Sequence, residues 1–192
     1  MREFILRALK AKTKGFNVND LVNAGRMDIV ARCVSNALFV AGDVRKDVVF
    51  HAVLEGADDP PRTITFIGAE VRGLDYDEKS IACKINEALV KGKQLKREEF
   101  LVLEPGIKIS KLSFESLIRE RKNVFYLHSK GKKISDFKFS ENVVFVFGDY
   151  IGMPRKTEGL LDRIGAIRIS LGKKELFAAS CVTIVNYELD LH

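Results

Sequence analysis

Two apolar runs near the C-terminus limit the folds that this chain can adopt. Residues 143–147 (VVFVF) run directly into Gly148, and residues 166–171 (AIRISL) end at Gly172. Such uninterrupted runs are typical of strands buried on both faces of a parallel sheet, and we expect a helix after each. Open sheets of this kind bind ligands at the carboxyl ends of their strands, so the pattern predicts a ligand site there.

The rest of the chain also alternates strands with helices. Residues 48–54 form another apolar run, in which we expect His51 to be a hydrogen-bonded core residue rather than a ligand. We expect residues 123–127 to be a strand that ends in a glycine-bearing loop at residues 128–133. Further strands are expected at residues 4–6 and 63–68, short extended pieces at 101–103 and 107–109, and helices at 26–38, 78–90, 114–121, 159–164 and 176–187. This order predicts one α/β domain over residues 1–192, with a mostly parallel sheet and helices on both faces.

Composition limits the class of protein. The 192 residues are 46% hydrophobic and 30% charged, which is usual for a globular domain. No apolar run approaches the roughly 18–20 residues of a membrane span, and residues 1–7 mix charged with apolar residues, unlike a signal peptide. The three cysteines (Cys33, Cys83 and Cys181) are too far apart for a disulfide framework or a zinc site. We therefore expect a cytoplasmic protein without a membrane segment or a metal ion.

The net charge of +6 is concentrated in one part of the sequence. Residues 91–138 hold 13 Lys/Arg against 6 Asp/Glu, a net of +7, and the rest of the chain holds 19 against 20, a net of −1. A local excess of positive charge favours phosphate backbones, although exposed lysines often only keep a protein in solution. We expect this segment to hold phosphates if the partner is a nucleic acid.

Few residues suggest catalytic chemistry by themselves. Cys181 and His128 have the residue types of a nucleophilic pair, but no local signature supports one, and no glycine-rich dinucleotide fingerprint or P-loop occurs. Asp28 lies in the first turn of the helix expected from Arg26, where a carboxylate suits the helix dipole. Because Arg26 and Asp28 are two residues apart, they point in different directions unless the start of the helix is bent. Asp28 then either takes part in chemistry or only supports the helix end.

Several segments together resemble a known class of enzymes. Residues 123–127, 143–153 and 167–187 resemble the three loops of SPOUT-class methyltransferases, whose C-terminal half is tied in a deep trefoil knot. Within this class, the chain is similar to the archaeal tRNA pseudouridine-54 N1-methyltransferases. That likeness is carried by residues 143–149, 167–172 and 178–181, and by residues 24–29 (AGRMDI). It covers both halves of the chain in a consistent order.

The resemblance implies a cofactor, a substrate and a set of site residues. It implies S-adenosylmethionine (SAM) bound near residues 123–192, a homodimer through the knot, and methylation of N1 of pseudouridine 54 in the tRNA T-arm. Gly148 would permit close approach of the cofactor, and Cys181 would be either a small wall of its pocket or a buried structural thiol. The residues expected at the cofactor are Leu127, Gly148, Leu171, Gly172, Lys173, Lys174, Glu175, Leu176 and Cys181.

The implied chemistry also assigns roles to side chains. N1 of pseudouridine carries a weakly acidic proton that must leave or be shared while the methyl group is transferred. Asp28 would grip or deprotonate the base, and Arg26 would stabilise the resulting negative charge or hold a phosphate. Asp149 is the second candidate carboxylate.

Three other functions are compatible with the sequence. The same fold is used for methylating pseudouridine in ribosomal RNA, which would be expected to require a larger basic face. A non-catalytic RNA-binding or assembly factor would bind RNA with a steep salt dependence but would bind no cofactor. A different nucleotide-binding enzyme on an ordinary doubly wound sheet is disfavoured by the missing glycine-rich fingerprint.

Overall fold

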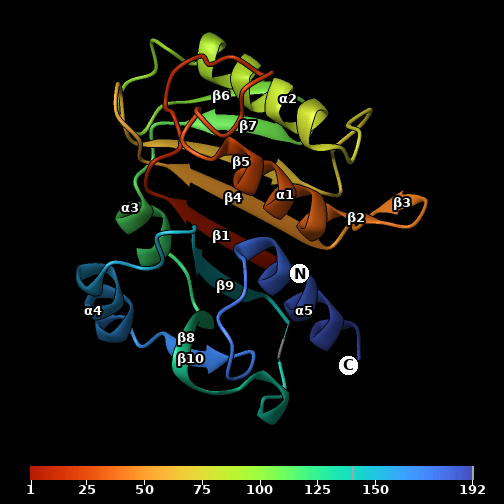
Figure 1. Cartoon of the computed structure of the whole chain (residues 1–192), viewed down its shortest axis with the longest axis vertical. Coiled ribbons are helices and arrows are strands. Elements are labelled where there is room, and N and C mark those ends of the chain that lie inside the picture. The colour runs from red at the N-terminus through yellow and green to blue at the C-terminus, as the bar shows by residue number, and fades with distance from the viewer. Residues whose placement is uncertain (140, 192) are drawn as a thin grey trace.

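The structure, a computed structural model, describes residues 1–139 and 141–191. Its main feature is an eight-stranded sheet with the strand order β10-β8-β9-β1-β4-β5-β7-β6 (Figure 1). Strands β8, β9 and β10 come from the C-terminal half of the chain, and β9 pairs directly with the N-terminal strand β1. The two halves of the chain therefore share one sheet.

The sheet has a parallel part and an antiparallel part. The parallel strands are β1 (Arg2–Ala8), β4 (Val48–Leu54), β8 (Val124–Lys133), β9 (Val143–Gly148) and β10 (Ile167–Ser170). The antiparallel strands are β5 (Arg62–Ile67), β6 (Phe100–Glu104) and β7 (Ile107–Ser110). Strand β1 lies between β4 and β9 and pairs with both in parallel, which buries its apolar residues 4–6 on both faces.

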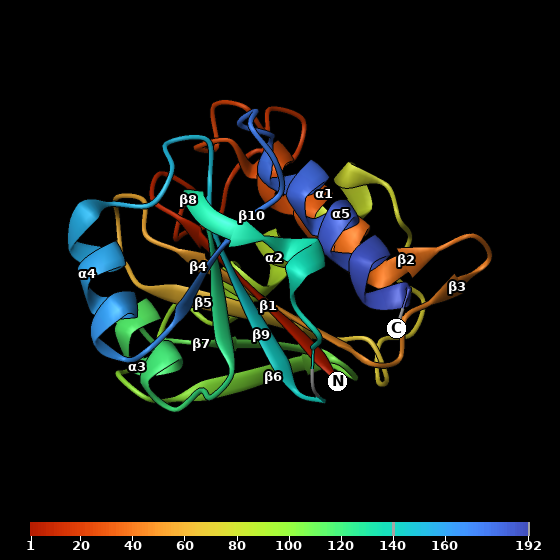
Figure 2. The same cartoon turned by 90° about the horizontal axis from the view of Figure 1, so that it is seen from below.

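Helices cover both faces of the sheet. The helices are α1 (Met27–Leu38), α2 (Glu78–Lys91), α3 (Phe114–Arg119), α4 (Arg155–Arg163) and α5 (Ala178–Asp190). Helices α1, α2 and α5 pack on the face that carries Phe4 and Leu6, and α3 and α4 pack on the face that carries Ile5 (Figure 2). The alternation of Phe4, Ile5 and Leu6 between two cores follows from the two-residue period of a strand.

Three smaller elements complete the fold. A short hairpin, β2 (Phe39–Val40) and β3 (Asp43–Val44), follows α1, and a 3₁₀ turn, η1 (Ile134–Asp136), follows β8. Asp77 and Ser113 cap α2 and α3 by accepting hydrogen bonds from the N–H groups of Ser80 and Ser116.

The structure confirms the predicted α/β class, the mostly parallel sheet and the helices on both faces. One local prediction is wrong: residues 128–133 are not a loop but continue β8 to Lys133. They extend the strand because β10 pairs with them, Ile169 opposite Lys132 and Ser170 opposite Lys133, after a bulge. His51 lies in the core as expected, with Nδ1 2.8 Å from Oγ1 of Thr65 and Nε2 2.9 Å from a carboxylate oxygen of Glu3.

Candidate cofactor and active site

The register of three parallel strands brings the expected cofactor residues together at the carboxyl ends of these strands. Tyr126 of β8 pairs with Val146 of β9 and with Arg168 of β10. Leu127, Gly148 and the last residues of β10 come shortly after these paired residues and therefore lie on the same side of the sheet, toward the carboxyl ends of the strands. Leu127 and Leu171 both pack, half-buried, against the core cluster that contains Cys181. The residues that are far apart in sequence thus meet where the strand pattern predicts a ligand.

The loop from β10 to α5 has the features of a cradle. Gly172 has φ +134°, a conformation that favours glycine, and a Cβ placed there would meet open space. Cys181 is buried, and its Sγ lies 3.8 Å from the carbonyl oxygen of Leu176, to which the thiol is the donor. The side chains of Lys173, Lys174 and Glu175 are exposed. These three residues can therefore contribute only backbone groups to the inside of the loop.

Large apolar side chains are exposed on the two loops that border the carboxyl ends of these strands. Tyr150 and Ile151 follow β9, and Leu176 and Phe177 precede α5; Phe177 is 78% exposed. Exposed apolar side chains that gather on loops mark a binding surface more often than side chains scattered singly. The loops therefore offer apolar surface and backbone groups, which are the groups that a purine and its ribose require.

Gly148 is required by a close contact within its own chain, and its expected role in letting the cofactor approach stays a prediction. A Cβ at Gly148 would lie 2.5 Å from the carbonyl carbon of Gly152 and 2.9 Å from the N atom of Met153. The close approach at Gly148 is therefore made by the loop of its own chain, which folds back over the end of β9. This glycine shapes the loop that carries Tyr150.

Asp149 fastens that loop to the loop after β1. Its carboxylate accepts hydrogen bonds from the N–H groups of Leu9 (2.8 Å) and Ile151 (2.9 Å). Burial raises the pKa of Asp149, although these backbone donors and that of Lys10 work in the opposite direction. Because backbone N–H groups of both loops occupy its carboxylate, Asp149 holds the loops together and is poorly placed to contact a substrate.

Arg26 and Asp28 form a close ion pair at the start of α1. Arg26 adopts a left-handed conformation (φ 64°, ψ 44°), so the chain bends immediately before the helix. The bend lets Nε and Nη2 of Arg26 each donate a hydrogen bond of 3.0 Å to one carboxylate oxygen of Asp28. These bonds lower the pKa of Asp28, which is buried, although burial itself works in the opposite direction. The sequence allowed this pairing only if the helix start was bent, and it is.

A contact that the sequence did not predict joins this pair to the β9 loop. The guanidinium carbon of Arg26 lies 5.4 Å from the centre of the Tyr150 ring, within the range of a cation–π contact. Burial raises the pKa of the Cys33 thiol on α1, with smaller contributions from Cys181 and Asp149. The Arg26–Asp28 pair therefore borders the candidate cofactor site. Nothing in the residue types around Tyr150 would have revealed this contact.

The basic segment of residues 91–138 does not form one surface. Lys93 and Lys96 precede β6 at one edge of the sheet, whereas Lys130, Lys132 and Lys133 lie on β8 near the opposite edge (Figure 1). Five strands, β9, β1, β4, β5 and β7, separate the two groups, which corresponds to roughly 25–30 Å at the usual strand spacing. The expectation that this segment holds phosphates as a unit is therefore corrected: only its β8 part lies beside the candidate site.

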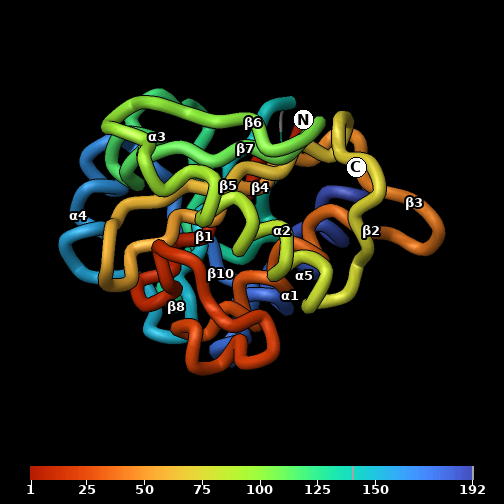
Figure 3. The backbone as a smooth tube through the Cα atoms, turned by 90° about the horizontal axis from the view of Figure 1, so that it is seen from above, coloured from red at the N-terminus to blue at the C-terminus, as the bar shows by residue number. Residues whose placement is uncertain are grey.

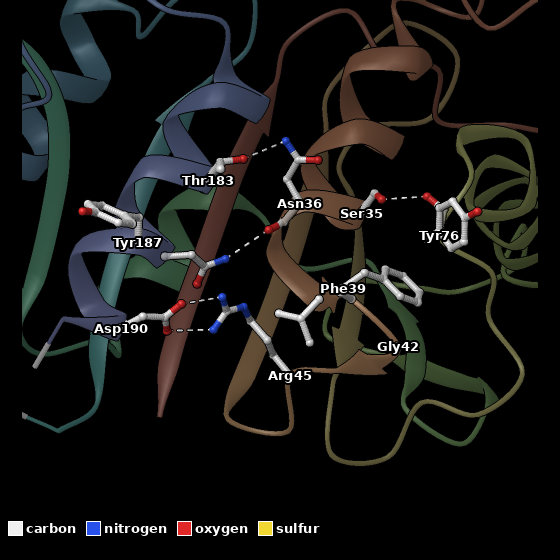
Figure 4. Close-up of a pocket in the computed structure, with 12 residues that line it drawn as sticks. Ser35, Asn36, Phe39, Gly42, Arg45, Tyr76, Thr183, Tyr187 and Asp190 are labelled. Atoms are coloured by element: carbon white, nitrogen blue, oxygen red, sulfur yellow. Dashed lines mark hydrogen bonds and ion pairs between the residues drawn. The ribbon is translucent and has the colours of Figure 1, made fainter.

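A separate groove of about 610 Å³ lies between the C-terminal parts of α1 and α5 (Figure 4). Its lining residues include Asn36, Phe39, Arg45, Tyr76, Thr183, Tyr187 and Asp190. None of the expected cofactor residues lines it, so this groove is not the predicted site. Within residues 1–139 and 141–191, no group of three or more His, Cys, Asp or Glu is arranged to hold a metal ion, and no helix is long and apolar enough to cross a membrane.

Comparison with solved structures finds proteins of similar overall fold. Archaeoglobus fulgidus Nep1, solved with S-adenosylhomocysteine, superposes with a TM-score of 0.60 at 16% identity, over 99% of this chain and 96% of that one. The fold is accordingly that of the SPOUT methyltransferases.

Sequence comparison defines the family. The family described as "Putative SAM-dependent RNA methyltransferase" matches residues 1–192. The tRNA (pseudouridine(54)-N(1))-methyltransferase of Methanocaldococcus jannaschii is 42% identical over 199 residues, covering 99% of this chain and 97% of that protein. The enzyme of the same name from Methanocella arvoryzae is also 42% identical, over 99% of each chain. The chain belongs to this family of SAM-dependent RNA methyltransferases.

Proposed function

We propose that this protein transfers a methyl group from SAM to N1 of pseudouridine 54 in the T-arm of tRNA. The observation that carries the proposal is the ion pair of Arg26 and Asp28, which borders the glycine-containing loop after β9. A base placed against this pair would lie beside a cofactor held by the loops after β9 and β10. The full-length similarity to enzymes named for this reaction supports the choice of substrate.

The loops provide what the cofactor requires. Backbone groups of residues 171–176 would hold the adenine, and the half-buried side chains of Leu127 and Leu171 would contact its apolar faces. Cys181 would close the far side of the cradle through its contact with the Leu176 carbonyl. When bound, SAM supplies the methyl group: the bond from N1 to carbon forms as the bond from sulfur to carbon breaks, and the N1 proton leaves to solvent.

The pair of Arg26 and Asp28 would orient the base and stabilise its charge. The lowered pKa of Asp28 makes this carboxylate a weak base, which disfavours direct deprotonation of N1. A carboxylate has about four acceptor sites, of which Arg26 and the backbone of Ile29 use three, so Asp28 can still accept a hydrogen bond from an N–H of the base. The guanidinium of Arg26 would stabilise the negative charge that develops on the ring.

The proposal extends to the assembly and the location of the enzyme. We propose a deep trefoil knot over residues 123–192, a homodimer formed through that region, and a cytoplasmic enzyme. The exposed side chains of Ile164, Ile167 and Phe177 belong to this part of the chain and offer apolar surface for a partner subunit. Sedimentation analysis tests the dimer, because a monomer at micromolar concentration would contradict it.

The decisive experiment measures methyl transfer from labelled SAM to two transcripts of one tRNA. One transcript carries pseudouridine at position 54, and the other carries uridine there. Label in the first transcript alone is the expected result. Label in both would place the methyl group on another atom, and label in neither, with SAM still bound, would direct the search to ribosomal RNA.

A further inference from the structure

The segment directly after β1 is a lysine-rich strap, residues 10–14 (KAKTK), that lies outside the basic segment discussed above. Lys10, Lys12 and Lys14 are exposed, whereas Ala11 and Thr13 between them are buried at 0% and 1% exposure. Alternate residues therefore anchor the strap to the protein while the lysines all point outward. Figure 3 shows this red segment looping along the outside of the molecule beside α1.

The backbone of the strap is held on both sides. The N–H of Lys12 donates to the carbonyl of Ala24 (3.1 Å), and the carbonyl of Ala11 accepts from Gly56 (2.9 Å). The hydroxyl of Thr13 donates to the carbonyl of Ala57 (2.8 Å) and accepts from the N–H of Asp59 (2.9 Å). The lysines consequently project from a fixed segment rather than from a free loop.

Two glycines allow the strap to lie this close. A Cβ at Gly25 would be 1.8 Å from the carbonyl oxygen of Lys10, and a Cβ at Gly56 would be 2.4 Å from that of Ala11. Because Gly25 directly precedes Arg26, the strap lies against the start of the Arg26–Asp28 site. The hydrogen bond from the N–H of Leu9 to Asp149 joins it to the β9 loop as well.

The positive charge of the strap is not neutralised by the protein. Among the residues that the structure describes, none forms an ion pair with the side chain of Lys10, Lys12 or Lys14. The nearby carboxylate of Asp59 is already taken by Arg62 and by Lys111. Three unpaired cations on a fixed backbone beside a base-binding site match the phosphates next to a base that has left its stack.

We propose that the lysine strap binds the RNA phosphates that flank the target nucleotide. The proposal rests on the proposed function, since it takes RNA as the substrate. The strap would set the register of the RNA, while the Arg26–Asp28 pair contacts the base. The three lysines are positioning residues, so their loss should affect the binding of RNA and not the binding of SAM.

The test compares three variants of the full chain with the parent protein, using a T-arm hairpin transcript that carries pseudouridine. The first variant is Lys10→Gln/Lys12→Gln/Lys14→Gln, and the second has Arg in place of the same lysines. The third, Lys93→Gln/Lys96→Gln/Arg97→Gln, removes the same charge from the exposed far edge of the sheet. RNA affinity is measured at several salt concentrations, SAM affinity by calorimetry, and methyl transfer separately.

The Gln variant of the strap should lose about 10- to 100-fold in RNA affinity near 0.1 M salt, and its salt slope should become shallower by about 2, since each contact contributes about 0.7 to 0.9. The Arg variant and the far-edge variant should bind RNA as the parent does, and SAM affinity should stay constant in all three. An unchanged affinity and slope in the Gln variant would overturn the proposal, as would a loss confined to the far-edge variant. If the parent binds RNA through the strap but transfers no methyl group to it, the proposed function fails and the strap remains an RNA-binding surface.

Discussion

The carboxylate of Asp28 accepts one hydrogen bond on each oxygen from the guanidinium of Arg26, two residues earlier in the chain. On a regular helix these side chains would diverge, because neighbours on one face are three or four residues apart. The left-handed conformation of Arg26 removes this obstacle by placing the arginine before the helix. A non-glycine residue in this conformation is uncommon, and strained positions of this kind cluster at functional sites.

We predict that Asp28→Asn lowers kcat/KM for methyl transfer about 100-fold, with SAM affinity unchanged, because the substitution removes the charge that holds Arg26. Arg26→Lys should not restore full activity, since lysine cannot make the two parallel hydrogen bonds. Steady-state kinetics on the T-arm transcript measure both effects. Glu78→Gln, which breaks an exposed ion pair between Glu78 of α2 and Arg32 of α1, is the matched control and should keep parental activity. Full activity of Asp28→Asn with unchanged RNA affinity would exclude the proposed role of Asp28.

The lowered pKa of Asp28 also predicts how stability depends on pH. A carboxylate whose pKa is lower in the folded than in the unfolded state stabilises the fold above its unfolded value of about 3.9, and this contribution is lost as the pH falls through the folded value. Near neutral pH the parent should therefore be more stable than Asp28→Asn by roughly 1–3 kcal/mol. Urea unfolding of the two proteins from about pH 7 to pH 3 should show the difference shrinking below about pH 4. A difference that stays constant over this range would show that the pair does not contribute through charge.

The sequence pattern predicted where the strands lie in the chain better than it predicted which strands pair with one another. Apolar runs identified β1, β4, β9 and β10, but the expectation that such a run is buried on both faces is wrong for β10, an edge strand in which only Ile169 is buried. The polar second half of β8 was missed, since residues 128–133 are only half-buried or exposed and pair through a bulge. Local composition contains no information on such an edge pairing.

The candidate site was predictable only in part, because it too depends on contacts between segments that are far apart in the sequence. Arg26 and Asp28 were identified from the sequence, but their pairing depends on one backbone angle, and the contact of Arg26 with Tyr150 depends on how two distant loops meet. The basic segment was misread as one surface because chain order is not sheet order: residues 93–97 and 130–133 lie at opposite ends of the sheet. The lysine strap could not be recognised from the sequence, because only the burial of Ala11 and Thr13 shows that its lysines project from a fixed backbone.

The loop before α5 depends on Gly172, and we predict that Gly172→Ala weakens SAM binding about 10-fold. The substitution meets no steric obstacle, so its effect arises from φ +134°, which costs a residue with a side chain about 1–3 kcal/mol. Calorimetry measures the affinity, and thermal unfolding measures the stability. Gly159→Ala in α4 is the matched control, because this helical glycine also faces open space but has an ordinary φ; it should raise stability by about 0.5–1 kcal/mol. Equal SAM affinity in both variants would show that the loop does not need its present conformation.

The thiol of Cys181 provides a probe of the same loop. Burial raises the pKa of Cys181 to about 11, so at pH 8 the thiol is almost entirely protonated and should react slowly with iodoacetamide. We expect alkylation at least about 100-fold slower than in urea, accelerating as the pH approaches 11, while the exposed Cys83 serves as the internal reference. S-adenosylhomocysteine should slow the labelling of Cys181 further and leave that of Cys83 unchanged, because only Cys181 borders the cradle through the Leu176 carbonyl. Mass spectrometry of the two peptides separates the rates. If the product protects neither cysteine while it binds with measurable affinity, the cofactor lies away from the loop between β10 and α5, and the assignment of residues 171–176 is wrong.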